Sequence, residues 1–486
     1  MDEHRERRTK IVATLGPATD SPETIRALIE AGMDVARLNM SHGTQEEHAR
    51  RLDTVRAEAE RAGRPVAALL DLQGPKIRTG PVAGDEPLDL QPGQGLVITT
   101  EPVAGTAERV STTYEHLAQD VHPGDRILIS DGLIEVRVTR TTGTEVHGEI
   151  VHGGRLRAHQ GINLPGVRVS APSVTDKDIE DLRFGLARGV DYVAISFVRQ
   201  AADVERMQRL IAEAGASVPV ITKLEKPEAL DHLEAIVAAS DGMMVARGDL
   251  GVEMPPERVP YAQKEIIRAA NRAAIPVITA TQMLESMIGN PRPTRAEVSD
   301  VANAILDGSD AVMLSGETAI GQYPVRAVEM MARIAATVDA NTGERPPEEV
   351  PAWLFAEARS IPQAIGAAVS AIGRTLPVTA LCVVTRTGSS ARMVTHYRPE
   401  TPILAFTPLP ETYRRLSLLW GVQPIPTRFA DSEDDYYAQV ESILLAKGYA
   451  REGDTVVVTG GHPIAQGGPT NFLKILVVGH SDSGAL

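Results

Sequence analysis

From residue 10 onward, short runs of β-branched and other apolar residues alternate with helical stretches, and this alternation restricts the fold more than any other feature of the chain. Strands that alternate with helices form a parallel sheet with crossover helices. Eight strands are expected once residues 80–171 are set aside: 10–15, 34–39, 66–71, 191–197, 219–225, 242–246, 276–281 and 310–315. Eight such units in about 260 residues predict a (β/α)8 TIM barrel, with a doubly wound open sheet as the alternative.

Two regions depart from the barrel pattern. Residues 80–171 are rich in Gly, Pro, Thr and Val, and they predict a small all-β lid domain inserted into a barrel of residues 1–79 and 172–341. The proline-rich, acidic segment 341–352 is typical of a linker. Residues 342–486 begin with a helical stretch and then alternate again, which predicts a five-stranded C-terminal α/β domain.

Composition argues against several classes of function. A net charge of −15 and an aromatic content of 3% are unfavourable for nucleic-acid binding, which uses basic surfaces and stacking side chains. No run approaches the ~18 apolar residues needed to span a bilayer. The single cysteine, Cys382, allows no internal disulfide, and the charged N-terminus has no apolar stretch behind it. We therefore expect a cytoplasmic protein with neither membrane nor nucleic-acid partners.

Polar side chains gather at the carboxyl ends of the expected strands, where barrel enzymes carry their active sites. Lys223 and Glu225 are two residues apart, so they point the same way from an extended chain. Arg37 lies between apolar neighbours and needs an anionic or carbonyl partner if it is buried. The other strand-end residues are Asn39, Ser41, His42, Asp71, Lys76, Arg78, Ser196, Phe197, Arg247, Gly248, Asp249, Thr281, Gln282, Ser315 and Glu317.

These residue types suit a phosphorylated carboxylate held with a metal ion. Arg and Lys neutralise phosphoryl oxygens, while Glu and Asp hold a hard divalent cation. Structural interpretations remain open: Lys223 and Glu225 can be a surface ion pair, Asp71 can cap a loop, and His42 can stand at a helix entry. No P-loop, dinucleotide-binding glycine pattern or His/Cys zinc set occurs in the sequence.

Taken as a set, the motifs resemble those of the pyruvate kinases over nearly the whole chain. The resemblance implies transfer of the phosphoryl group of phosphoenolpyruvate to ADP, which gives ATP and pyruvate in glycolysis, and it implies a homotetramer. The matching stretches are TKIVATLGPAT (9–19), ARLNMSHG (36–43), DLQGPKIRTG (71–80), GINLPG (161–166), ITKLEKPEAL (221–230), VARGDLGVE (245–253), the segment 280–319 and GGPTN (467–471).

The resemblance also implies roles for single residues. Lys223 would stabilise the transferring phosphoryl group and the enolate, and Arg37 would contact the phosphoryl group. Thr281 and the backbone of Gly248 and Asp249 would hold the carboxylate of phosphoenolpyruvate, with Thr281 near the site of enolate protonation.

The same resemblance implies a metal site, a nucleotide site and a mobile lid. The metal ligands would be Glu225 and Asp249, and the ion would be Mg²⁺ or Mn²⁺. The inserted β domain is similar to the lid of the family. The nucleotide, ADP or ATP, would be bound by Asn39, Ser41, His42 and Arg78.

One departure from the family pattern concerns potassium. Lys76 stands where the family usually has an acidic residue beside its K⁺ site. An ammonium group in the field of Asp71 could replace the ion, so we expect catalysis that does not require K⁺. The positions that match the family's K⁺ ligands are Asn39, Ser41, Asp71 and the carbonyl of Leu72.

A second departure lies in the lid, where Gln160 replaces the lysine that usually precedes the G-x-N-L-P-G motif. Arg155 or Arg157 would have to compensate for the lost contact with the nucleotide phosphates. In the C-terminal domain, TRTGSSAR (385–392) offers hydroxyls and backbone N–H groups to a sugar-phosphate or AMP effector. An ordinary strand-to-helix turn is the alternative for that segment.

Two other functions remain as alternatives at this point. Metal-dependent aldolases and lyases that act on pyruvate enolates also use barrels with carboxylate-bound magnesium, but they would lack the lid and the nucleotide residues. A non-catalytic sensor of a phosphorylated metabolite would be expected to have lost Lys223 or a metal carboxylate, and both are present.

Overall fold

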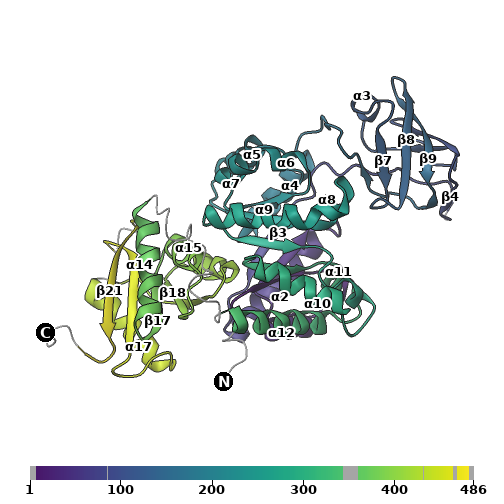
Figure 1. Ribbon diagram of the computed structural model, residues 1–486. Coiled ribbons are helices and arrows are strands. Elements are labelled where there is room, and N and C mark those ends of the chain that lie inside the picture. The colour runs from purple at the N-terminus through teal and green to yellow at the C-terminus, as the bar shows by residue number, and fades with distance from the viewer. Residues whose placement is uncertain (1–6, 85, 343–359, 431, 464–467, 481–486) are drawn as a thin grey trace.

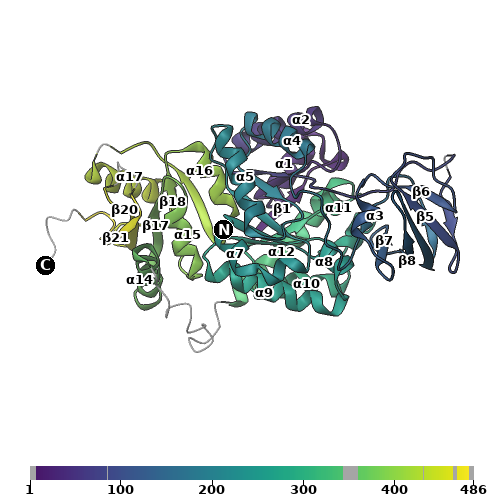
Figure 2. The same cartoon turned by 90° about the horizontal axis from the view of Figure 1, so that it is seen from above.

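The computed structural model describes residues 7–84, 86–342, 360–430, 432–463 and 468–480. A central barrel separates a β-rich lid from the C-terminal domain, and these two lie at opposite ends of the molecule in both views (Figure 1 and Figure 2). The expected linker at 341–352 falls almost entirely outside the described residues. Among the helices that the structure describes, none has the length and apolar character of a membrane span.

Eight parallel strands form a closed barrel, which confirms the predicted fold. The open-sheet alternative is wrong, because the first strand pairs with both the second and the last strand of the barrel. In their order around the barrel, the strands are β1 (Lys10–Thr14), β16 (Ala311–Leu314), β15 (Val277–Ala280), β14 (Gly242–Ala246), β13 (Val220–Leu224), β12 (Tyr192–Ile195), β3 (Ala67–Asp71) and β2 (Val35–Asn39).

Amphipathic helices cover the outside of the barrel and bury their apolar faces against the strands. Several begin at a hydroxyl residue that accepts a backbone N–H of the first turn, as Thr44, Thr175 and Thr294 do. The main helices are α1 (Pro22–Ala31), α2 (Gln45–Ala62), α4 (Asp176–Ala187), α5 (Ala201–Glu213), α7 (Leu233–Ala239), α9 (Val259–Arg272), α10 (Arg295–Leu306) and α12 (Pro324–Thr342). Shorter helices are α6 (Glu228–Asp231), α8 (Arg247–Glu253) and α11 (Gly316–Ala319).

The lid is an all-β unit, as predicted, built between β3 and α4. Six strands form one sheet in the order β11-β7-β8-β9-β5-β6, and β10 and β4 pair separately. Its core is apolar and separate from that of the barrel. The bounds are β4 (Leu88–Leu90), β5 (Gly95–Thr99), β6 (Arg109–Ser111), β7 (Arg126–Ile129), β8 (Ile134–Thr141), β9 (Glu145–His152), β10 (Gly154–Leu156) and β11 (Ile162–Asn163), with the short helix α3 (Leu117–Asp120) between β6 and β7.

The C-terminal domain has the five expected strands in the order β19-β18-β17-β20-β21. The last strand runs antiparallel to β20, because residues 462–469 are too few for a crossover helix. The elements are α14 (Ile361–Thr375), β17 (Val378–Val384), α15 (Ser389–His396), β18 (Ile403–Thr407), α16 (Pro410–Arg415), the 3-10 turn η6 (Leu416–Leu418), β19 (Val422–Pro426), α17 (Glu433–Ala446), β20 (Thr455–Gly461) and β21 (Thr470–Val477).

The C-terminal domain closes the amino end of the barrel. Leu418 of η6 belongs to the apolar cluster inside the barrel, beside Val12 and Leu69. Arg398 donates to Gly308 O at 2.8 Å and to Asp310 Oδ1 at 3.0 Å, which fixes the domain to the loop before β16. The lid is therefore left at the carboxyl end, where the predicted site residues lie.

Four aspartates at the amino end of the barrel repeat one contact. The four aspartates directly precede β2, β12, β14 and β16. Each carboxylate accepts, at 2.8–2.9 Å, the backbone N–H of a residue in the barrel strand that comes before in the chain, which is β1, β3, β13 or β15 respectively. The aspartate's own backbone N–H donates to the carbonyl of that same residue. The pairs are Asp34 with Ile11, Asp191 with Ala68, Asp241 with Val220, and Asp310 with Val277.

Replacing one of these carboxylates should destabilise the protein without touching the mouth of the barrel. Asp241→Ala leaves the N–H of Val220 without its acceptor, and we expect a loss of about 1–3 kcal/mol in the free energy of unfolding. Urea unfolding measures this loss. Asp231→Ala, which removes an exposed carboxylate from α6, is the matched control and should change stability little. Equal stability of the two variants would contradict a structural role for the aspartate contacts.

Candidate active site

A buried carboxylate, Asp71, holds two cations together at the carboxyl end of the barrel. Arg37 Nε lies 2.7 Å from Asp71 Oδ2, and Lys223 Nζ lies 3.2 Å from Asp71 Oδ1. Lys223 also contacts Glu225 Oε1 at 2.8 Å and donates to Ser196 Oγ at 2.8 Å. These residues come from β2, β3 and β13 and from the loop after β12, so the closed sheet brings together residues far apart in the sequence.

Lys223 and Glu225 point the same way, as their spacing predicts, and they do form an ion pair. The alternative of a surface pair is wrong, because their side chains are only 12% and 3% exposed. A buried pair requires further partners for its remaining donors and acceptors. Glu225 Oε2 accepts the backbone N–H of Phe197 at 2.8 Å, which provides one of them.

The charges set the protonation states of the cluster. Burial alone would lower the pKa of Lys223, but the carboxylates of Asp71 and Glu225 outweigh it and raise that pKa. Burial would raise the pKa of Asp71, yet Lys223 and Arg37 bring it below its ordinary value. The pKa of Glu225 is raised, first by burial and then by the negative charge of Asp249, against the opposing effect of Lys223. Lys223 is therefore a permanent cation directed into the mouth.

Glu225 and Asp249 are the carboxylates of this site that would hold a divalent cation. The two carboxylates repel each other in a buried setting, and a bound cation would relieve that repulsion. In the part of the chain that the structure describes, no three His, Cys, Asp or Glu residues form a metal-binding group. Two carboxylates without a full protein cage suit Mg²⁺, which usually shares its coordination with water and substrate phosphate.

Thr281 lies in an unusual turn at the end of β15. Its Oγ1 accepts the backbone N–H of Gly248 at 2.7 Å and donates to Ala280 O at 2.6 Å. Thr281 and Gln282 have φ angles of 66° and 53°, a left-handed conformation that costs about 1–2 kcal/mol for a non-glycine residue. A Cβ at Gly248 would lie 3.3 Å from Thr281 Oγ1, so a side chain there would require this hydroxyl to shift slightly.

The four residues expected at the nucleotide stand at or after the ends of β2 and β3, which are neighbouring strands of the barrel. The pKa of His42 is lowered, first by burial and then by the positive charges of Lys76, Arg78 and Arg37, which shows that these side chains share one basic region. Arg78 donates to His159 O at 3.1 Å and so lies at the junction of barrel and lid. Basic character of this kind is required to bind phosphate groups in a protein of net negative charge.

Two of the positions that match a K⁺ site, Leu72 and Asn39, accept hydrogen bonds from protein groups. The carbonyl of Leu72 accepts Ser196 Oγ at 2.8 Å, and Asn39 Oδ1 accepts the backbone N–H of Ser41 at 3.2 Å. The side chain of Lys76 is exposed, and among the described residues it forms no ion pair with Asp71. The cations that neutralise Asp71 are Arg37 and Lys223 instead.

A small cavity lies between lid and barrel, and its wall includes Lys76 and Asp249. Three further residues bridge the two domains beside it, and the sequence analysis missed them. Lys226 Nζ lies 2.6 Å from Glu253 Oε1, and Asn163 of the lid donates to the same oxygen at 3.0 Å. All three fall inside matched motifs, but their spacing gives no sign of a mutual contact.

Gln160 takes no part in this bridge. Its Oε1 accepts Ser130 Oγ at 2.7 Å and its backbone N–H donates to Thr79 Oγ1 at 2.9 Å, so the residue is held within the lid and its hinge. Arg155 lies 3.8 Å from Asp89 on the small two-stranded sheet, and both side chains are largely exposed.

A (β/α)8 barrel with a lid, buried cations at the mouth and paired carboxylates defines an enzyme that handles phosphoryl and enolate chemistry with a divalent metal. Comparison with known proteins narrows this class. Residues 6–328 match the family model "Pyruvate kinase, barrel domain", and residues 363–476 match "Pyruvate kinase, alpha/beta domain".

Individual relatives agree with the family models. Pyruvate kinase 2 of Synechocystis sp. is 48% identical over 476 residues, which is 97% of this chain and 79% of that protein. A pyruvate kinase of Staphylococcus aureus is 46% identical over 475 residues, covering 97% of this chain and 81% of that protein. A solved pyruvate kinase from Cryptosporidium parvum superposes with a TM-score of 0.91 at 36% identity, covering 98% of this chain and 97% of that one.

The chain therefore belongs to the pyruvate kinase family. It is a glycolytic phosphotransferase that moves the phosphoryl group of phosphoenolpyruvate to ADP and releases pyruvate and ATP. Enzymes of this family generally need a divalent metal ion. Neither the aldolase nor the sensor alternative is supported by these matches.

Removing the charge of Asp71 should destabilise the fold in a pH-dependent way. Asp71→Asn leaves Arg37 and Lys223 less neutralised in a buried site, which costs about 3–5 kcal/mol at neutral pH. Because the pKa of Asp71 is depressed, its contribution is complete above the ordinary carboxyl value of about 3.9 and is lost as pH falls through the folded value.

Urea unfolding at several pH values should therefore show a large difference between wild type and Asp71→Asn at pH 7 that shrinks in acid. Asp53→Asn, which breaks an exposed ion pair with Arg188, is the matched control and should have little effect at any pH. A difference independent of pH would show that Asp71 does not act through its charge.

Proposed function

We propose that Lys223 and Arg37 carry the phosphoryl transfer in this enzyme. The observation that supports this most is the position of Lys223 Nζ, which two carboxylates keep charged and directed into the mouth. Phosphoryl transfer mainly requires positioning and neutralisation of charge on the transferred group. Arg37, held by Asp71 and by Thr14 Oγ1 at 2.9 Å, adds a second cation whose direction is fixed.

We propose that Glu225 and Asp249 bind the metal ion, Mg²⁺ or Mn²⁺. When bound, the ion would neutralise charge on the phosphoryl oxygens and the enolate oxygen. Glu225 is oriented for this by Lys223 and by the N–H of Phe197, while Asp249 lies at the start of α8 in the wall of the cavity.

The carboxylate of phosphoenolpyruvate belongs at the first turn of α8, near Gly248 and Asp249, with Thr281 beside it. Backbone N–H groups at a helix start suit a carboxylate, and Gly248 lets the substrate come close to the backbone. In this proposal Thr281 stands next to the substrate's carbon C3, where the enolate is protonated. The lid then excludes water from that step.

The nucleotide occupies the basic side of the mouth, beside Asn39, Ser41, His42 and Arg78. The support for this is the shared positive field at His42 and the place of Arg78 at the lid junction. Gln160 stands where the family usually has a lysine that contacts the nucleotide phosphates. Arg157 is exposed and forms no ion pair with any described residue, so it is available to bind those phosphates instead.

Three wider assignments complete the proposal. The chain forms a homotetramer, for which the exposed apolar residues Ile475 and Val477 on the edge strand β21 offer one contact surface. Light scattering measures the mass of the assembly.

The turn at 385–392 binds a sugar phosphate or AMP. The test is to measure saturation by phosphoenolpyruvate at increasing concentrations of each effector. The enzyme works in the cytoplasm with the rest of glycolysis, which cell fractionation can check.

Lys223→Met should abolish catalysis and spare metal binding. We expect a fall in kcat of at least about 10³-fold, because the side chain neutralises charge that develops in the transition state. Pyruvate formation from phosphoenolpyruvate and ADP, coupled to lactate dehydrogenase, measures the rate, and Mn²⁺ titration measures metal affinity. The matched control Lys447→Met, at an exposed lysine of the C-terminal domain, should behave as wild type. Retained activity in Lys223→Met would refute the assignment.

Catalysis should not require K⁺. The carbonyl and amide oxygens that would bind the ion are already engaged by Ser196 and by the Ser41 backbone, and Asp71 is neutralised by Arg37 and Lys223. We expect the same kcat, within about twofold, in a buffer free of potassium and sodium as in one with KCl. A many-fold loss of wild-type activity without K⁺ would refute the proposal.

A further inference from the structure

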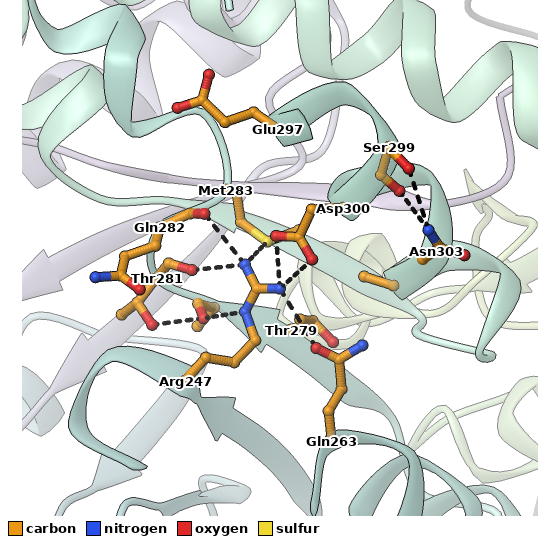
Figure 3. A network of polar contacts seen from close by, with 12 residues as sticks. Arg247, Gln263, Thr279, Thr281, Gln282, Met283, Glu297, Ser299, Asp300 and Asn303 are labelled. Atoms are coloured by element: carbon orange, nitrogen blue, oxygen red, sulfur yellow. Dashed lines mark hydrogen bonds and ion pairs between the residues drawn. The ribbon is translucent and has the colours of Figure 1, made fainter. Parts of the chain in front are cut away.

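The side chain of Arg247 links the turn that carries Thr281 to the helices behind it (Figure 3). Arg247 follows β14 as the first residue of α8, and only 9% of it is exposed. It lies at a strand end like the proposed catalytic residues, and its guanidinium contacts the turn after β15 on one side and Asp300 on the other. The role of a buried arginine depends on which groups accept its N–H bonds.

One side of the guanidinium binds three consecutive backbone carbonyls. Nη2 donates to Thr281 O at 2.8 Å and to Gln282 O at 3.3 Å, and Nε donates to Ala280 O at 3.3 Å. Nη2 also contacts the sulfur of Met283 at 2.7 Å. A single side chain therefore fixes the course of the backbone through the whole turn.

The other side of the guanidinium is anchored to two helices. Nη1 lies 2.7 Å from Asp300 Oδ2 on α10 and 3.4 Å from Gln263 Oε1 on α9. Gln263 in turn donates to Asp307 at 2.9 Å. The turn is thus attached to the outer helices through Arg247, which gives it a rigid support.

This turn needs such a support because of its backbone conformation. Thr281 and Gln282 are both left-handed, and for a β-branched threonine this conformation is a rare one. The conformation directs Thr281 Oγ1 toward Gly248 N, whose N–H it accepts, and its O–H toward Ala280 O, so one lone pair of the oxygen remains for a water or for substrate. A change in the turn would therefore move this hydroxyl.

We propose that Arg247 is a positioning residue for the protonation of the enolate and has little part in phosphoryl transfer. The proposal rests on the role assigned to Thr281 above. In the second step the enolate gains one proton at C3 while its C2–O⁻ becomes the ketone carbonyl, and no electrons enter or leave. Among the described residues, the side chain of Arg247 has no hydrogen bond or ion pair with Lys223, Arg37 or Glu225.

The test separates the two steps in Arg247→Lys, because an ammonium group cannot reach three carbonyls and Asp300 together. Proton transfer is measured as the rate at which the methyl hydrogens of pyruvate are replaced by deuterium in D₂O. NMR monitors this exchange, with Mg²⁺ and inorganic phosphate present. Phosphoryl transfer is measured as ATP formed in a single turnover from phosphoenolpyruvate and ADP. We expect exchange to fall about 100-fold and single-turnover ATP formation to fall less than about threefold.

Asp300→Asn provides a second variant if Arg247→Lys is poorly folded. Asp300 is partly exposed, and asparagine keeps an acceptor for Nη1 but removes the charge. Exchange should fall about tenfold, with ATP formation unchanged. The matched control is Arg268→Lys, at an exposed arginine of α9, which should leave both rates at the wild-type level.

Different outcomes overturn different claims. Equal losses of exchange and ATP formation in Arg247→Lys, or no loss of either, would show that Arg247 has no specific role in the proton step. Thr281→Val tells the two claims apart. If it leaves exchange intact, the role of Thr281 fails and the role of Arg247 fails with it. If Thr281→Val abolishes exchange while Arg247→Lys does not, only the inference about Arg247 is wrong.

Discussion

Closure of the eight-stranded sheet is the constraint on which the rest of the structure depends, and it is reinforced by a repeated contact at the amino end. Four aspartates each form two hydrogen bonds with one residue near the start of a neighbouring strand: the carboxylate accepts its backbone N–H, and the backbone N–H of the aspartate donates to its carbonyl. They are Asp34, Asp191, Asp241 and Asp310. These contacts help to fix the register of strand pairs at the amino end of the barrel. Because register is fixed at one end, the positions of side chains at the other end follow from counting residues along each strand.

The carboxyl end has the opposite character, since it concentrates charges that a folded protein normally keeps apart. Asp71 reduces the repulsion between Arg37 and Lys223 by forming an ion pair with each. Glu225 forms a second ion pair with Lys223. The remaining imbalance lies with Glu225, whose pKa is raised beside Asp249. The site is therefore neutral enough to fold but still favours a divalent cation and an anionic substrate.

The sequence predicted the barrel, the all-β lid and the five-stranded C-terminal domain, because strand and helix periodicities and turn residues are local properties. It predicted from their spacing that Lys223 and Glu225 point the same way, but it considered an ion pair between them only as a surface pair, whereas the observed pair is buried. It missed the repeated aspartates, the Lys226–Glu253–Asn163 bridge and the network of Arg247. Each of these contacts joins residues that are far apart along the chain. The sequence shows an aspartate at the start of four strands, but nothing local indicates which backbone group its carboxylate meets.

The sequence by itself determined which chemistry this protein can perform, since the residue types at eight strand ends are set by the order of amino acids. The tertiary structure alone decided which of those residues meet. Asp71 could cap a loop or neutralise cations, and only barrel closure brings it to Arg37 and Lys223. Lys76 is near Asp71 in sequence but exposed in the structure. The reason is physical: burial decides the partners and the pKa of a charged group, and burial depends on segments distant in sequence.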